Sequence, residues 1–164
     1  MSVLALTNER WGFASNCYAC EPTNDTGLRI PFFHDTDAGI VFAEFNLDGR
    51  FSGAPAYLHG GITLTVLDEA MAWAAIAVAG QWAVTHTTST TFDRPIKVGS
   101  TYRVEARIDQ VEPDAIEASA IVTGAGGTTR ARARATFVPL GAAQAVDAIG
   151  TVPEGPDTTF FRSK

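Results

Sequence analysis

Apolar and polar side chains alternate along three consecutive segments in the second half of the chain. Residues 101–111 carry an apolar side chain at every second position, namely Tyr102, Val104, Ala106 and Ile108. Residues 128–140 repeat the pattern, with Ala and Phe on one side and arginines on the other. Residues 115–124 form the middle segment, between two turn signals. A period of two predicts antiparallel strands with one buried and one solvated face.

Two further strands and one long helix precede these segments. Residues 40–47 are rich in β-branched and aromatic side chains, and residues 83–92 are rich in Thr and Val, as strands commonly are. Residues 61–79 are too long for one strand, and their Ala, Leu and Met residues favour a helix capped by Gly80. Apolar residues occur nearly all round this helix, so we expect it to be buried on most sides.

These elements predict a single α+β domain over residues 1–140, in which an antiparallel sheet of five to six strands wraps around one long central helix. One sheet covers only one side of a helix that is apolar all round, so we expect at least a dimer. The tail over residues 141–164 is weakly patterned. We expect it to be partly extended, with Phe160 and Phe161 docking on the body or on a partner subunit.

The composition is that of a globular protein. The 164 residues are 46% hydrophobic and 18% charged, which suits one domain of ordinary size. A net charge of −6 argues against nucleic acid as the main partner, although it allows a local basic patch. No basic segment precedes the short apolar stretch at the N-terminus, and the longest apolar run, residues 70–80, is too short to cross a bilayer. We therefore expect a cytoplasmic protein with no membrane partner.

Two adjacent acids interrupt the predicted helix. Asp68 and Glu69 are the only Asp, Glu, Lys or Arg residues between Arg50 and Asp93. Neighbouring helical positions differ by about 100°, so the two carboxylates cannot point into the same cleft. A buried carboxylate without a partner costs several kcal/mol, which favours a functional Asp68 over one that merely bonds to a Ser or Thr. For Glu69 we favour a structural role, an ion pair with an arginine.

The helix opens with His59, Gly60 and Gly61. Helix N-termini offer free backbone N–H groups and the positive end of the helix dipole, and glycine lets a ligand oxygen approach closely. The Gly61 N–H, helped by Gly60, is therefore a candidate donor to a developing oxyanion. The alternative is a purely structural role, in which Gly60 and Gly61 only form a tight connection between loop and helix. His59 either contacts the substrate or closes the loop. Thr65 and Asp68 fall on the same helical face as Gly61, which could line a cleft.

Several motifs together resemble one family. They are 51-FSGAPAYLHGG-61 with Asp68 nine residues after the histidine, 92-FDRPIKVG-99, and 17-CYACEPTNDTGL-28. In combination, over roughly residues 17–138, they resemble the hotdog-fold acyl-CoA thioesterases of the PaaI-like (phenylacetate-pathway) group. The resemblance implies a hotdog fold, an acyl-CoA substrate, and a homodimer or a dimer of dimers.

The resemblance also implies roles for individual residues. Asp68 acts as general base toward water or as nucleophile, and these two mechanisms stay open. Thr85, which follows Val84, matches a Ser or Thr that comes from the other subunit and orients the water, although Thr is also common in any strand. Some relatives carry Asn or Gln about six residues before the histidine, where this chain has Gly53.

Basic residues are expected where coenzyme A enters. Arg94 and Lys97 follow the Thr-rich strand and are candidates for binding the CoA phosphates. The row Arg130, Arg132 and Arg134 is better explained by cross-strand pairing with acids such as Glu105, Glu117 or Asp109.

Cys17 and Cys20 form a Cys-x-x-Cys pair without an obvious function. Zinc needs about four ligands, and only His34 and His59 are otherwise at hand, with poor spacing. No βαβ pattern surrounds the pair, which disfavours a redox role. We therefore expect no metal and no cofactor.

The alternative to an enzyme is a non-catalytic protein of the same fold that binds acyl-CoA or another hydrophobic ligand. A hotdog dehydratase is disfavoured, because Asp68 has no histidine a few residues downstream.

Overall fold

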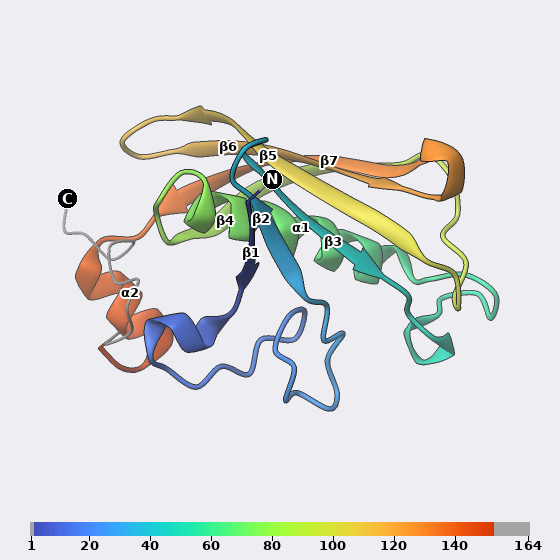
Figure 1. Cartoon of the computed structure of the whole chain (residues 1–164), viewed down its shortest axis with the longest axis horizontal. Helices are drawn as coiled ribbons and strands as arrows, with labels where there is room; N and C mark the ends of the chain where they lie inside the picture. Colours follow the sequence, from blue (N-terminus) through green and yellow to red (C-terminus); the bar gives the residue numbers. More distant parts are fainter. Residues whose placement is uncertain (1, 153–164) are drawn as a thin grey trace.

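The computed structural model describes residues 2–152 and shows an antiparallel sheet folded over one long helix (Figure 1). The seven strands lie in the order β1-β2-β3-β5-β6-β7-β4. The strands are β1 (Val3–Leu6), β2 (Phe32–Asp35), β3 (Ile40–Phe45), β4 (Ala83–Phe92), β5 (Tyr102–Val111), β6 (Ile116–Thr123) and β7 (Thr129–Pro139). The helices are α1 (Gly60–Ala77) and α2 (Ala142–Ile149), with short 3₁₀ turns at Asn8–Trp11, Gly49–Phe51 and Ala125–Gly127. The predicted fold class is confirmed.

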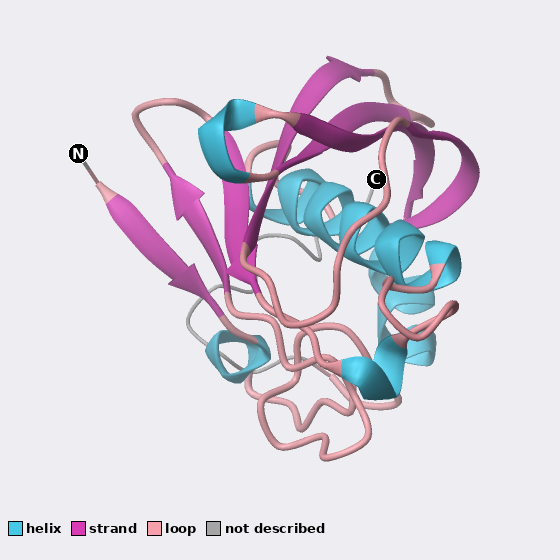
Figure 2. Ribbon diagram, turned by 90° about the vertical axis from the view of Figure 1, so that its right-hand side faces the viewer, coloured by secondary structure: helices cyan, strands magenta, loops and turns pink. Residues whose placement is uncertain are grey.

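The core lies between α1 and the concave face of the sheet, which curves around the helix (Figure 2). The alternation predicted for the last strand is confirmed, because Ala131, Ala133, Ala135 and Phe137 are all buried. Small Ala side chains let the helix pack close to the sheet, and the larger Phe137 is fully enclosed. The same alternation holds on β5, where Tyr102, Val104 and Ala106 are buried.

Helix α1 runs as predicted, within a residue or two at either end. It begins at Gly60, and Gly80, at a φ of 71°, closes its C-terminal turn by donating its N–H to the Ile76 carbonyl at 3.1 Å. Its 18 residues and mean hydropathy of 1.2 match a membrane span by length and composition, yet half of the helix is buried inside the domain. The core helix of a globular protein has these properties too.

The structure adds elements at both ends of the described chain. Strands β1 and β2 extend the sheet beyond the five strands that the pattern identified, and raise the count above the expected five to six. They pair antiparallel with one another, and β2 pairs with β3. The start of the tail is helical rather than extended, because residues 142–149 form α2 and bury its Ala145 side chain. Phe160 and Phe161 lie outside the described residues.

Strand β4 is an edge strand with a bulge. It pairs only with β7 in the described sheet, and the register shifts between Thr85 and Thr87, so His86 is an extra residue. Thr85 lies opposite the buried Phe137, whereas beyond the bulge Phe92 lies opposite the buried Ala131. The bulge therefore changes which side chains of β4 face α1, from odd-numbered to even-numbered positions.

The segment between the first 3₁₀ turn and β2 is pinned by backbone hydrogen bonds to itself. The N–H of Leu28 donates to the Tyr18 carbonyl at 2.7 Å, and the N–H of Ile30 donates to the Ala19 carbonyl at 2.9 Å. A side chain at Gly27 would place its Cβ 2.4 Å from the Tyr18 oxygen, so only glycine fits there. This tight loop fixes the position of Cys17 and Cys20.

Candidate active site

His59 caps the N-terminus of α1. Its Nδ1 accepts a hydrogen bond from the Gly61 N–H at 2.9 Å. The Gly61 N–H, which the sequence favoured as the oxyanion donor, is therefore already used. The neighbouring Gly60 is an exposed residue, and its N–H has no hydrogen-bond partner among residues 2–152. The free donor at this helix end is thus Gly60, and His59 closes the helix start.

We expect His59→Ala to lower the free energy of unfolding by about 1 kcal/mol, the usual cost of losing a side-chain cap. The substitution leaves the Gly61 N–H without its partner. His59→Asn should recover most of the loss, because asparagine is a preferred N-cap residue. Urea unfolding of the two variants measures the difference. Equal destabilisation by both would show that the cap is not what His59 contributes.

A pocket of about 270 Å³ opens beside the free Gly60 N–H. Its walls are mostly apolar and include Leu58, Gly60, Phe92, Arg94 and Ile96. The Phe92 ring lies close enough that a Cβ at Gly60 would meet it at 3.7 Å. Of the two predicted basic residues, Arg94 lines this pocket. Lys97 does not, and its backbone N–H donates to the Tyr102 hydroxyl at 3.0 Å.

Asp68 projects from α1 toward β4. The Thr85 hydroxyl donates to Asp68 Oδ1 at 2.8 Å, so the structure brings these two predicted site residues together. The contact lies within one chain, whereas the resemblance implied that Thr85 comes from the other subunit. Burial raises the pKa of Asp68 above its usual value, and the Thr85 hydrogen bond opposes this shift. A carboxylate with a raised pKa and one fixed hydroxyl partner is suited to proton transfer.

The two parts of the site are far apart along one helix. Gly60 and Asp68 both belong to α1 and are eight residues apart, which is about 12 Å at 1.5 Å per residue. An oxyanion donor and a base must each lie within about 3 Å of the same carbonyl group and its attacking water. The single-helix cleft that the sequence suggested is therefore too long. Thr65, predicted to line it, donates its hydroxyl to the Gly61 carbonyl at 2.9 Å.

Glu69 points away from Asp68, as the helical geometry predicted, but its partner is not an arginine. It accepts a hydrogen bond from the Cys17 thiol at 3.3 Å, and no salt bridge joins it to a described residue. Burial, followed by the charge of Cys17, raises the pKa of Glu69 to about 8. A hydrogen bond from the Cys20 thiol lowers the pKa of Cys17 to about 5, whereas the same pairing and burial raise the pKa of Cys20.

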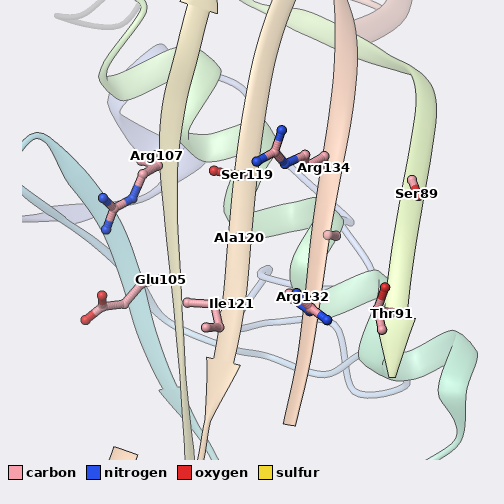
Figure 3. A pocket seen from close by; sticks show the side chains of 10 residues that line it. Ser89, Thr91, Glu105, Arg107, Ser119, Ala120, Ile121, Arg132 and Arg134 are labelled. Atoms are coloured by element: carbon pink, nitrogen blue, oxygen red, sulfur yellow. The ribbon is translucent and has the colours of Figure 1, made fainter. Parts of the chain in front are cut away.

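The outer face of the sheet carries a second, shallow hollow of about 480 Å³ (Figure 3). Figure 3 shows Arg107 on β5, and Arg132 and Arg134 on β7, with β6 between these two strands. The predicted cross-strand pairing is wrong for Arg132, which binds Asp93 at 3.1 Å. The expected partner Glu105 instead pairs with Arg103 at 2.7 Å. This polar face lies on the opposite side of the sheet from α1, so we separate it from the site around Asp68.

The chain is similar to known proteins in sequence over one segment and in fold. Residues 56–131, which include His59, Asp68, Thr85 and Arg94, match the family model of the thioesterase superfamily. None of the curated proteins compared with the chain matches it.

Solved structures agree on the fold. A protein described as a thioesterase superfamily protein superposes with a TM-score of 0.69 at 22% identity, over 75% of this chain and 60% of that chain. A Streptococcus mutans protein bound to acetyl-CoA gives 0.60 and 22%, over 63% and 82% of the two chains. PaaI from the phenylacetic acid degradation operon of E. coli gives 0.58 and 20%, over 63% and 74%.

These similarities define a hotdog fold, with an antiparallel sheet packed on one long helix. Residues 56–131 match the thioesterase superfamily model, and the fold is similar to that of PaaI, in line with the sequence resemblance. It spans 60% of the length of the first of these neighbours.

Proposed function

We propose that the protein hydrolyses an acyl-CoA thioester to the free acid and coenzyme A. The observation that carries this proposal is the half-buried Asp68 carboxylate, held by the Thr85 hydroxyl at 2.8 Å on the helix whose N-terminus presents the free Gly60 N–H. Carboxylate and donor are the two groups that thioester hydrolysis requires.

In the proposed reaction, Asp68 takes a proton from water as the water oxygen bonds to the thioester carbon. The carbonyl electron pair moves to its oxygen, which the Gly60 N–H stabilises at the positive end of the helix dipole. The tetrahedral species then collapses, the C–S bond breaks, and the CoA sulfur leaves with the proton that Asp68 received. The alternative, attack by Asp68 itself to form a mixed anhydride, uses the same residues and ends in the same products.

The proposed site needs two chains. Because Gly60 and Asp68 of one α1 are about 12 Å apart, we infer a two-fold dimer in which α1 lies antiparallel to its partner's helix, so that Gly60 approaches the partner's Asp68. The edge strand β4 supports this arrangement. Its outer edge has no partner among the described strands, and it exposes 44% of Val84 and 54% of Phe92. Long edges of this kind are normally covered.

The coenzyme A moiety is assigned to the mouth of the pocket at Gly60. Arg94 lines that pocket, next to Asp93, and supplies a positive charge for a phosphate. The structural neighbour from Streptococcus mutans was determined with acetyl-CoA bound, which supports a ligand of this class. The acyl group would lie along the apolar pocket wall formed by Leu58 and Phe92.

A panel of acyl-CoA esters tests the proposal, with a thiol-reactive dye to detect released coenzyme A. We expect turnover with at least one ester. Tight binding of acyl-CoA by calorimetry with no thiol release across the panel would instead support a ligand-binding protein of the same fold.

Thr85→Val should move the acid limb of the kcat/KM–pH profile to higher pH. The Thr85 hydrogen bond stabilises the charged form of Asp68 and holds its pKa down, so removing the hydroxyl raises that pKa further. Asp68 must be deprotonated to act as base, so activity then disappears at a higher pH as the solution is acidified. Thr87→Val, on the same strand beyond the bulge, is the matched control and should leave the limb in place.

A further inference from the structure

Three potential metal ligands converge where the N-terminal segment crosses α1. The sulfur atoms of Cys17 and Cys20 and a carboxylate oxygen of Glu69 all lie within 4.8 Å of one another. The Cys17 sulfur and Glu69 Oε1 are 3.3 Å apart. Two ligands of one tetrahedral zinc ion, with bonds of about 2.3 Å to sulfur and 2.0 Å to oxygen, lie about 3.5 Å apart. The Cys17 and Glu69 atoms therefore already have nearly the separation that one ion requires, and the Cys20 sulfur lies within 4.8 Å of both.

The loop that carries Cys17 and Cys20 holds their two sulfur atoms close together. Cys17 and Cys20 occupy a tight turn, in which the Glu21 N–H donates to the Cys17 carbonyl at 3.3 Å. Both thiols lie on one short loop and can therefore act together as thiolates, the form in which cysteine binds metal. The backbone N–H groups of Leu28 and Ile30 donate to the carbonyls of Tyr18 and Ala19, respectively, and these hydrogen bonds hold the turn in place. The pair is thus preorganised rather than mobile.

Glu69 is a partly buried acid that has no cation beside it in the described part of the chain. Among the described residues its hydrogen bond comes from the Cys17 thiol, and no Lys, Arg or His lies within ion-pair distance. Ionising a carboxyl group that is withdrawn from water costs free energy unless a cation lies beside it. A divalent cation between Glu69 and two thiolates removes that cost, and the mixed sulfur and oxygen set suits zinc.

We propose that Cys17, Cys20 and Glu69 bind one Zn²⁺ ion, which fastens the N-terminal segment to α1 beside Asp68. Binding replaces the protons held by the thiols and the carboxyl group, which are released to solvent, with no change of oxidation state. A water molecule takes the fourth position. A cavity of about 170 Å³, lined by Cys20, Asn8, Phe32 and Trp73, gives solvent access to that side.

Asn8 is not one of the proposed ligands, but it hydrogen-bonds to one of them. Its Nδ2 lies 3.9 Å from the Cys20 sulfur and donates to it. Hydrogen-bond partners of metal ligands typically contribute about 10- to 100-fold in metal affinity. Asn8→Ala should therefore weaken zinc binding by about that factor without removing a ligand.

Cobalt substitution of the reduced, full-length protein tests the site directly. We expect one equivalent of Co²⁺ to bind and to produce a thiolate-to-cobalt charge-transfer band together with the intense visible bands of a tetrahedral ion. Zn²⁺ should displace the cobalt mole for mole and protect both cysteines from a thiol reagent. Chelation of the zinc should lower the Tm, because the ion binds the folded state only.

Three substitutions and one control assign the ligands. Cys17→Ser, Cys20→Ser and the isosteric Glu69→Gln should each remove or strongly weaken the cobalt spectrum, with circular dichroism confirming that each variant is folded. Glu21→Gln is the control, because Glu21 follows Cys20 but bonds to Thr23 instead. The proposal fails if the wild-type protein binds no equimolar cobalt, or if Glu21→Gln rather than Glu69→Gln abolishes binding. It also fails if the protein, isolated without oxygen and without added reductant, already contains a Cys17–Cys20 disulfide.

Discussion

Asp68→Asn is expected to reduce kcat for acyl-CoA hydrolysis on the order of 10²- to 10⁴-fold, the usual contribution of a positioned general base. Asparagine keeps the size of the side chain and can still accept the Thr85 hydroxyl at its amide oxygen. It cannot take a proton from water or attack a carbonyl. A stopped assay for released thiol measures the loss.

Asp109→Asn is the matched control for this substitution. Asp109 is also a carboxylate that accepts a hydrogen bond from one hydroxyl, that of Ser119 at 3.0 Å, but it lies on the outer face of the sheet. Its removal should leave kcat unchanged. Equal rates for Asp68→Asn and the wild type would remove Asp68 from the mechanism, whatever the fate of the control.

Gly60→Pro should lower kcat by about 10²- to 10³-fold, the cost of deleting one oxyanion donor. Proline lacks the N–H group that we assign to the oxyanion, and it is well tolerated at the first position of a helix. The preceding His59 has φ −62° and ψ 136°, the extended conformation that a following proline requires. Folding should therefore be preserved while the donor is lost.

Gly60→Ala distinguishes loss of the N–H donor from crowding by an added side chain. Alanine keeps the N–H and adds only a methyl group, which would meet the Phe92 ring at an ordinary contact distance of 3.7 Å. We expect a much smaller loss of kcat than for proline. If alanine and proline are equally harmful, crowding at Gly60 explains the effect and the oxyanion role is withdrawn.

Mixing the two inactive variants tests whether the site is shared between chains. In a dimer of Gly60→Pro with Asp68→Asn, shared sites place both substitutions in one site and leave the other intact. Random pairing of the two chains should then restore about a quarter of the wild-type activity. Sites contained within single chains would each keep one defect, and no activity would return.

Some side-chain arrangements around the site could be predicted from the sequence, and others could not. Adjacent acids on a helix must point apart, so the separation of Asp68 from Glu69 followed from local geometry alone. The partner of Glu69 did not, because Cys17 lies 52 residues away along the chain and nothing local relates the two. The arginine expected for Glu69 was reasonable by charge. The fold instead places a pair of thiols there.

The sequence also could not predict which N–H group is free at the N-terminus of α1. The sequence identified His59, Gly60 and Gly61 as a helix start, but it could not say which N–H remained free. The answer depends on the side-chain conformation of His59. Its Nδ1 accepts a hydrogen bond from the Gly61 N–H, so the Gly60 N–H stays free to bind a ligand. Likewise, the bulge at His86 decides that Thr85 faces Asp68, and a one-residue shift would have turned it away.

By itself, the sequence determined the strands with a period of two, the long apolar helix, the position of Asp68 on it and the likeness to thioesterases. These properties are local, because periodicity and propensity act over a few neighbouring residues. Tertiary structure alone decided which donor is free at Gly60, which hydroxyl meets Asp68, and that Cys17, Cys20 and Glu69 converge. Those facts depend on contacts between segments distant in the chain, which only the packing of α1 against the sheet and the N-terminal loop brings together.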